Sequence, residues 1–189
     1  MHSLDLSAIS DADKRACEAI AADAGVNLKD CYQCGKCSAG CPMAASMDIQ
    51  PRQVVRLLQR GMADELLKSK TIWLCATCHM CEDRCPNSIN IPGLIENARY
   101  EAKRIKMCAV GEVDKFNDIF IENVKNFGKS QEVILEGAYN ILTGNFIQDM
   151  GSVPHMLRHG IVQPEIHMVK ERENVRKLVD AAQKEDEKC

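Results

Sequence analysis

The sequence predicts an all-α protein, and three observations support this fold class. Phe, Tyr and Trp together make up only 4% of the 189 residues, whereas hydrophobic residues reach an ordinary 46%. A core with so few aromatic residues is built mainly from Leu, Ile, Val, Met and Ala, which favours helices over a β-sandwich. Apolar residues also recur at helical spacing, and Ser, Asn and Pro stand where helices would begin.

The first expected helix covers residues 3–27. Ser3 or Asp5 could cap it, and Gly25 suits its end. Its apolar stripe is weak and consists of Ala16, Ile20 and Ala21.

Three further helices are expected before residue 108. Pro51 fits the first position of a helix, which Gly61 ends or bends, and a short helix is expected around residues 63–68. Asn90 and Pro92 open the next helix. The apolar positions of these helices are Val54, Leu58 and Met62, with Val55 and Leu66 beside them, and then Leu94, Ile95, Ala98 and Ile105.

The remaining chain predicts a helical extension. An apolar stripe within residues 116–127 predicts a helix that ends at Gly128, and Ser130 could cap a second helix through residues 133–142. Gly144, Gly151 and Pro154 then interrupt the pattern. Residues 164–184 predict a charge-rich helix with few apolar positions, which is typical of a helix that is solvated or docked on another chain.

Two cysteine runs dominate the middle of the sequence. They read CYQCGKCSAGCP from Cys31 to Pro42 and CATCHMCEDRCP from Cys75 to Pro86. Both follow C-x2-C-x2-C-x3-C-P, which is typical of proteins that bind two [4Fe–4S] clusters. Two-residue spacers let one tight loop place three thiolates around three irons of a cubane, and the proline then turns the chain away.

The fourth cysteine of each run is expected to ligate the neighbouring cluster. The first predicted cluster therefore has as ligands Cys31, Cys34, Cys37 and Cys85. The second predicted cluster has Cys75, Cys78, Cys81 and Cys41. This crossed ligation would tie the two halves together and hold the clusters close, as an electron relay requires.

Zinc is the alternative metal. Structural zinc sites take four ligands, usually as two C-x2–4-C pairs. The third cysteine of each run would then be surplus, and the two Cys-Pro endings would be unexplained. A three-iron variant is disfavoured because all eight cysteines are present.

Other possible ligands are weaker candidates. Cys17, Cys108 and Cys189 lie outside the runs, and the first two are expected to be buried structural thiols. A third cluster would need a fourth ligand. Inside the second run, His79 and Met80 are expected to pack near the cluster rather than to bind it. Trp73 is expected to shield a cluster, and the surface is expected to contain His155, His159 and His167.

Charge and composition restrict the remaining functions. The net charge of −3 does not favour binding to nucleic acid or to a membrane surface. Residues 31–106 carry +4, which could offset the negative charge of thiolate-bound clusters, although chance explains it equally well. No dinucleotide fingerprint and no nucleophile–base arrangement is visible, so no catalytic residue is expected. The absence of a signal peptide and of a long apolar stretch predicts a cytoplasmic protein without a membrane span, and clustered cysteines then indicate metal rather than disulfides.

At these runs the sequence resembles the all-helical ferredoxin module of iron–sulfur subunits in succinate dehydrogenase, fumarate reductase, glycolate oxidase and anaerobic glycerol-phosphate dehydrogenase. The strings TIWLCATCHMCEDRCP and CYQCGKCSAGCP, the short acidic N-terminal helix, the helical C-terminal half and the length most resemble the iron–sulfur C subunit of the soluble CoB–CoM heterodisulfide reductases of methanogens. The chain also repeats itself after each run, as Cys41-Pro42 … Ile49-Gln50-Pro51 and then Cys85-Pro86 … Ile89-Asn90-Ile91-Pro92. This internal repeat predicts a two-cluster α-helical ferredoxin domain at 28–107. An N-terminal helix at 1–27 is expected before it, and a helical region at 108–189 is expected to dock on other subunits.

The resemblance also implies a function. In that family the C subunit carries electrons from a flavin-containing iron–sulfur subunit to the catalytic subunit, which cleaves the disulfide between coenzyme M and coenzyme B. The complex bifurcates electrons to ferredoxin, and a hydrogenase or formate dehydrogenase module supplies them. The alternatives are an iron–sulfur subunit of another dehydrogenase and a free ferredoxin-like carrier. A plant-type [2Fe–2S] domain, expected in subunits like those of succinate dehydrogenase, is not visible in the sequence.

Overall fold

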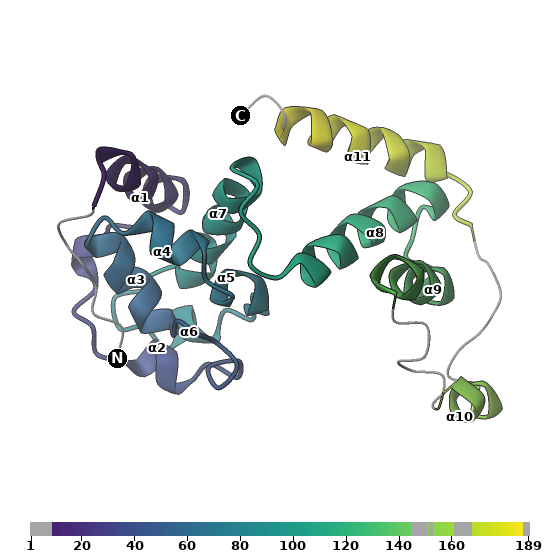
Figure 1. Ribbon diagram of the computed structural model, residues 1–189, viewed down its shortest axis with the longest axis horizontal. Coiled ribbons are helices and arrows are strands. Elements are labelled where there is room, and N and C mark those ends of the chain that lie inside the picture. The colour runs from purple at the N-terminus through teal and green to yellow at the C-terminus, as the bar shows by residue number, and fades with distance from the viewer. Residues whose placement is uncertain (1–8, 145–150, 152, 161–167, 187–189) are drawn as a thin grey trace. The chain divides into compact units, whose positions relative to one another are not determined.

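The computed structural model describes residues 9–144, 151, 153–160 and 168–186 (Figure 1). The chain divides into two compact units, Met1–Val110 and Gly111–Cys189. Every regular element among the described residues is a helix, and none of these residues lies in a strand. The prediction of an all-α fold is therefore confirmed.

Helix α1 covers Asp11–Asp23 and begins later than expected. Its cap is Ser10, whose Oγ accepts a hydrogen bond from the N–H of Asp13 at 3.0 Å, while the Asp13 carboxylate accepts one from the N–H of Ser10 at 3.3 Å. This reciprocal capping starts the helix after Ser10, so the prediction that Ile9 and Ser10 are helical was wrong. Ser3 and Asp5 lie outside the described residues. Gly25 lies just beyond the end of the helix with a φ of 65°, as predicted, but residues 24–27 of the predicted range are not helical.

The two proline-led helices form as predicted. Pro51 is the first residue of α3, and Gly61 follows that helix with a φ of 72°. The side chain of Asn90 caps α7 by accepting a hydrogen bond from the N–H of Gly93 at 2.8 Å. Ile105 lies just past the end of α7 and is 41% exposed, so its assignment to the apolar face was wrong. The elements of the first unit after α1 are η2 (Leu28–Asp30), α2 (Lys36–Ala39), α3 (Pro51–Gln59), α4 (Ala63–Leu67), α5 (Thr71–Leu74), α6 (Met80–Asp83) and α7 (Ile91–Arg104).

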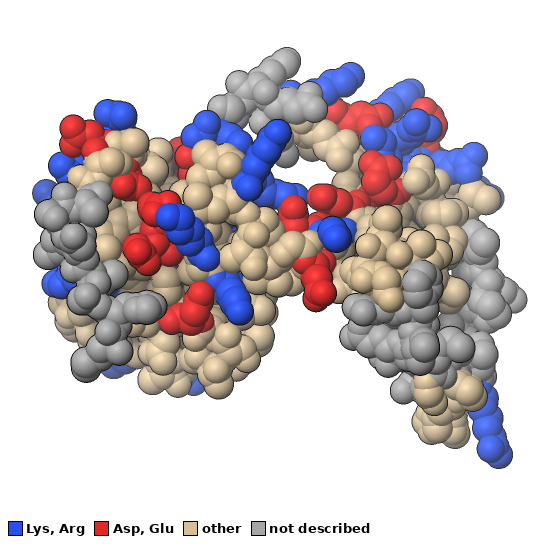
Figure 2. All heavy atoms as spheres, in the orientation of Figure 1, with Lys and Arg blue, Asp and Glu red and all other residues tan. Residues whose placement is uncertain are grey.

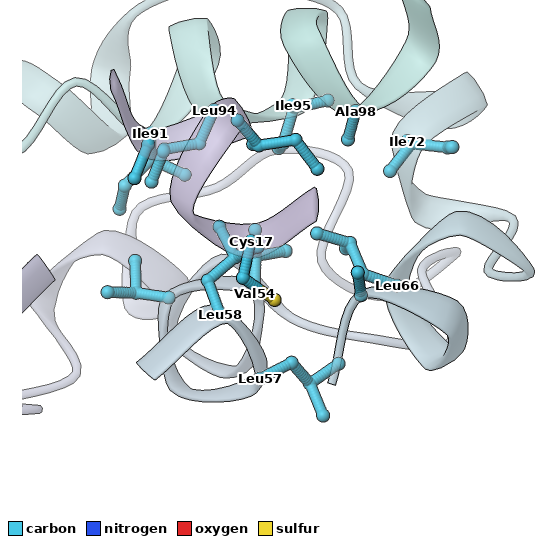
Figure 3. Packing of buried hydrophobic residues seen from close by; sticks show 14 of the residues in the cluster. Cys17, Val54, Leu57, Leu58, Leu66, Ile72, Ile91, Leu94, Ile95 and Ala98 are labelled. Atoms are coloured by element: carbon cyan, nitrogen blue, oxygen red, sulfur yellow. The ribbon is translucent and has the colours of Figure 1, made fainter. Parts of the chain in front are cut away.

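One hydrophobic core holds the first unit together. Helices α1, α3, α4, α5 and α7 pack against one another around it. Figure 3 shows apolar side chains of α3, α4 and α7 gathered together with Cys17 of α1. Burying each large aliphatic side chain contributes roughly 1.5–3 kcal/mol. The core fixes the helices that flank both cysteine runs, and its fully buried side chains include Val54, Val55, Leu66, Ile72, Ile91, Leu94 and Ile95.

Asp48 joins the segment after the first cysteine run to the helix before the second. Its carboxylate accepts hydrogen bonds from the N–H of Lys70 at 2.8 Å, from the N–H of Thr71 at 3.0 Å and from the Thr71 hydroxyl at 2.7 Å. Burial alone would raise the pKa of Asp48, but these bonds and one from the N–H of Ile49 lower it below the ordinary value.

We therefore expect Asp48→Ala to lower the free energy of unfolding of the first unit by about 1–3 kcal/mol, because the N–H and hydroxyl of the buried Thr71 lose an acceptor. A carboxylate with a lowered pKa in the folded state stabilises the fold above its unfolded pKa of about 3.9, and this contribution is lost as pH falls through the folded pKa. Thermal unfolding of the wild-type chain and of the Asp48→Ala variant across pH checks this, and the two unfolding midpoints should converge in acid. Asp23→Ala removes an exposed carboxylate and is the matched control. A constant difference at every pH would contradict the assignment.

The second unit differs from the predicted pattern in three places. It contains α8 (Gly111–Phe127), α9 (Glu132–Thr143), α10 (Val153–Arg158) and α11 (Arg172–Asp186). The cap of α9 is Gln131, not Ser130, and the short α10 includes Pro154, which was expected to interrupt a helix. The charge-rich helix begins at Arg172 rather than at residue 164. Residues 161–167 lie outside the described part, and residues 168–171 are not helical.

Polar contacts fix the helices of the second unit. Asn123 of α8 is buried, and its Oδ1 accepts a hydrogen bond from the N–H of Gln131 at 2.7 Å. Lys125 of α8 forms an ion pair with Asp180 of α11 at 2.5 Å. These contacts hold α9 and α11 against α8, and the predicted end of α8 is confirmed by a φ of 80° at Gly128.

None of the described helices is long and apolar enough to cross a membrane.

Candidate metal centres

The two cysteine runs fold as two copies of one local structure. In the first, Gln33 and Gly35 have φ values of 63° and 86°, and α2 begins directly afterwards. In the second, Thr77 and His79 have φ values of 50° and 58°, and α6 begins directly afterwards. Gln33, Thr77 and His79 are not glycine, and such backbone conformations cost of order 1 kcal/mol or more each. They turn each loop so that its three thiols face one hollow.

The first hollow has an empty volume of about 350 Å³ including its open mouth. It lies between the first cysteine loop and the segment after α6, so that Cys85 joins the three cysteines of the other run. Arg52, Ile89 and Ile91 also line it. The four cysteines at this hollow are Cys31, Cys34, Cys37 and Cys85.

The second hollow is nearly the same size, at about 360 Å³. It lies between the second cysteine loop and the segment after α2, with Met47 and Ile95 among its apolar lining. The four cysteines at this hollow are Cys41, Cys75, Cys78 and Cys81. The structure thus brings together the two predicted sets of four, and their ligation of clusters remains a proposal.

The third cysteine of each loop is the most enclosed. Cys37 and Cys81 are each 8% exposed, whereas Cys34 and Cys78 are exposed at the surface. Burial raises the pKa of the Cys37 thiol, and burial beside Cys75 raises the pKa of Cys81 to about 12. Buried thiols of this kind become thiolates only when a cation compensates them, as bound iron does.

The donor set fits two cubanes. Each hollow has four thiols, one for each iron of a [4Fe–4S] cluster, and apolar walls that limit the access of water. A four-cysteine zinc site would use the same number of thiolates, so ligand count alone does not separate the two metals.

The iron and sulfide content separates them directly. We expect the anaerobically purified chain to contain about eight irons and eight acid-labile sulfides, since two cubanes need that many. Metal analysis with a sulfide assay measures both numbers. Stoichiometric zinc without iron would contradict the assignment.

The other candidate residues lie apart from the thiol sets. Cys17 is buried as predicted, and burial raises the pKa of its thiol to about 12, which makes it unreactive. Cys108 is only half-buried and packs against the core, while Cys189 lies outside the described residues. None of the ten described cysteines forms a disulfide. Trp73 is buried in the core but is not among the residues lining either hollow.

The histidines and Met80 lie near the surface. His79 lines the second hollow, and its Nδ1 lies 2.9 Å from a carboxylate oxygen of Glu82. Met80 also lines this hollow and is 40% exposed. His155 and His159 are exposed as predicted, with ring centroids 4.4 Å apart. His167 lies outside the described residues.

Two residues that the sequence did not single out hold the cysteine loops in place. Nε2 of Gln59 donates hydrogen bonds to the carbonyl oxygens of Leu28 at 2.7 Å and Cys31 at 3.0 Å. The guanidinium of Arg99 donates to the carbonyl oxygens of Ile72 and Cys75. The signal that could have found them is the internal repeat, because each lies nine residues after the cap of its helix, at Gln50 and at Asn90.

Comparison with known proteins assigns the cysteine-rich region. Residues 27–89 match the 4Fe-4S dicluster domain family. The chain is 37% identical over 92 residues to the C subunit of the H(2):CoB-CoM heterodisulfide,ferredoxin reductase of Methanothermobacter marburgensis, covering 49% of this chain and 50% of the relative. It is 35% identical over 115 residues to the iron-sulfur C subunit of the CoB–CoM heterodisulfide reductase of Methanopyrus kandleri, covering 54% and 60%.

A third relative is also a heterodisulfide reductase C subunit that the chain matches over only part of its length. The C subunit of the Ferredoxin:CoB-CoM heterodisulfide reductase of Methanosarcina mazei is 32% identical over 81 residues, covering 43% of this chain and 50% of the relative. The chain thus spans about half the length of the curated relatives it matches. The match of residues 27–89 to a 4Fe–4S dicluster domain supports two [4Fe–4S] clusters, and the chain is similar to the iron–sulfur C subunit of the CoB–CoM heterodisulfide reductases of methanogens.

Proposed function

We propose that this chain is the electron-transfer subunit of a heterodisulfide reductase. The observation that carries the proposal is the pair of four-cysteine hollows inside a domain similar to the C subunit of such reductases. Bound [4Fe–4S] clusters supply one-electron transfer. The two sets of four thiols would hold them, and apolar residues such as Ile89 and Ile95 would shield the inner side of each cluster from water.

The proposed path runs from a flavin-containing iron–sulfur subunit to the catalytic subunit, which reduces CoM-S-S-CoB to coenzyme M and coenzyme B. The names of the relatives include heterodisulfide, ferredoxin and H(2), which supports a heterodisulfide as the final electron acceptor. The proposal further includes coupling to ferredoxin by flavin-based bifurcation, with a hydrogenase or formate dehydrogenase as the upstream donor. The chain itself is proposed to be non-catalytic and to act in the cytoplasm.

Surface exposure supports a role within a larger complex. Cys34 and Cys78 are exposed, so each hollow opens to the surface, where a redox partner can come close to the bound cluster. On the face drawn in Figure 2, uncharged residues cover most of the surface around α2. The second unit also exposes large apolar side chains on α8 and α9, namely Phe116, Phe120, Ile121, Val133, Ile141 and Leu142. Such side chains are typical of surfaces that bind other proteins.

Affinity purification of the tagged chain from its native host under anaerobic conditions tests the proposal. We expect two partner proteins to co-purify, one that binds flavin and one that is rich in cysteine, and the assembly to reduce CoM-S-S-CoB. Adding Cys41→Ala to the tagged chain should retain the partners but greatly reduce electron flow from the flavin donor to the heterodisulfide, whereas Cys108→Ser should retain both.

Two outcomes would favour other functions. A stable monomer without partners would favour a free ferredoxin-like carrier. Recovery of a glycolate- or glycerol-phosphate-type dehydrogenase, or of a fumarate reductase, would assign the chain to that enzyme instead.

A further inference from the structure

The two cluster loops are held in the same way by two helices that differ in charge. Gln59 of α3 donates from Nε2 to the carbonyl oxygens of Leu28 and Cys31. Arg99 of α7 donates from its guanidinium to the carbonyl oxygens of Ile72 and Cys75. Each contact therefore reaches the first cysteine of a run and the residue three positions before it. The neutral amide of Gln59 thus holds the first cysteine loop, and the positively charged guanidinium of Arg99 holds the second.

The guanidinium of Arg99 is hydrogen-bonded to neutral acceptors. Its hydrogen-bond partners Ile72 and Cys75 contribute uncharged main-chain carbonyls, so these bonds leave the positive charge in place. The side chain is half-buried, where water screens a charge less than at the surface. Arg52 lines the first hollow and also carries a positive charge, but it is exposed. At the second hollow, His79 is exposed and pairs with Glu82.

We propose that Gln59 and Arg99 are equivalent positioning residues, and that the charge of Arg99 raises the reduction potential of the cluster ringed by Cys41, Cys75, Cys78 and Cys81. Each cluster accepts one electron on reduction, so a nearby fixed positive charge stabilises the reduced state over the oxidised state. Arg99 does not line the second hollow but reaches it through the Cys75 carbonyl, so its charge adds to the potential of that cluster. Gln59 makes the equivalent contact with Cys31 and adds no charge at the first cluster. This inference rests on the proposed ligand sets and does not depend on the identity of the partner enzyme.

Charge and positioning can be separated by substitution. Arg99→Gln places at the second site the residue that occupies the first, so it retains a side-chain donor and removes the charge. Arg99→Lys retains the charge but lacks the two-pronged geometry of the guanidinium. Gln59→Arg adds a charge at the first site. Arg99→Ala removes both the charge and the donor.

The experiment is a redox titration of the full-length, cluster-loaded chain, followed by electron paramagnetic resonance. We expect Arg99→Gln to lower the reduction potential of one cluster. The equilibrium constant for transferring an electron from the other cluster to this one should fall about tenfold, which is about 59 mV for a one-electron couple. Arg99→Lys should leave that couple near its original potential. Gln59→Arg should raise the potential of the other couple, and iron content should fall only in Arg99→Ala.

The outcomes separate the proposed effect of the Arg99 charge from the cysteine ligand sets on which it rests. Iron-loaded Arg99→Gln protein with unchanged potentials would overturn the inference alone. It would also be overturned if Arg99→Gln and Gln59→Arg moved the same couple, or if Arg99→Lys lowered the potential as much as Arg99→Gln. A wild-type chain without two iron–sulfur clusters would overturn the ligand sets together with the inference.

Discussion

Cys41→Ala is expected to remove the cluster held by the second cysteine run, although Cys41 belongs to the first. Cys41 shares the second hollow with Cys75, Cys78 and Cys81, and it does not line the first hollow. Alanine cannot ligate iron, so one cubane loses a quarter of its protein ligands while the other keeps all four. We expect the iron content to fall from about eight to about four. Cys108→Ser, which changes a thiol outside both runs, is the control and should retain both clusters.

Double substitutions identify which cluster is lost. If Cys41 and Cys78 serve the same cluster, Cys41→Ala combined with Cys78→Ala should retain about as much iron as either change alone. Cys41→Ala combined with Cys34→Ala should instead lose both clusters. The reverse pattern would mean that each run binds its own cluster and would refute crossed ligation. Cys85→Ala offers a reciprocal check, because it should behave as a ligand of the first cluster.

Leu94→Ala is expected to cause a large loss of stability, although Leu94 lines neither hollow. Leu94 is fully buried in α7 and lies in the core shared by α1, α3, α4 and α7 (Figure 3). Truncating a buried leucine removes apolar burial and leaves a cavity, at a cost of about 2–5 kcal/mol. Since small domains are stable by only roughly 5–15 kcal/mol, this is a large fraction of the total.

Two measurements check this prediction. The thermal unfolding midpoint of the first unit should fall, and iron should be released faster on warming, because α7 also anchors the second cysteine loop through Arg99. Leu178→Ala in α11 is the matched control, since Leu178 is 71% exposed and its truncation should change stability by less than about 0.5 kcal/mol. Equal effects of the two substitutions would contradict the location of the core.

The sequence by itself determined the helical class and the sites where helices start and stop for local reasons. Pro51 and Asn90 act on their own helix ends, so their effect could be predicted without tertiary contacts. The cysteine runs were equally informative, because the spacing of thiols within one loop is a local property that iron chemistry restricts. The one-turn helices α2, α5 and α6 escaped prediction because four residues are too few to show an apolar periodicity.

Only the tertiary structure decided which residues from distant parts of the chain meet. The packing of α3 and α7 in a common core brings Cys85 to the first loop and Cys41 to the second. The cysteine spacing predicted this pairing only by analogy with other two-cluster proteins, because spacing within one run does not determine contacts with the other run. The same packing brings Gln59 and Arg99 to main-chain carbonyls 28 and 24 residues away. No local pattern encodes such contacts, because a carbonyl oxygen is present at every residue and carries no sequence signature. The sequence therefore determined that the ligands are thiols. The packing of the core determined which four thiols share a hollow, and it placed the neutral Gln59 beside one set and the charged Arg99 beside the other.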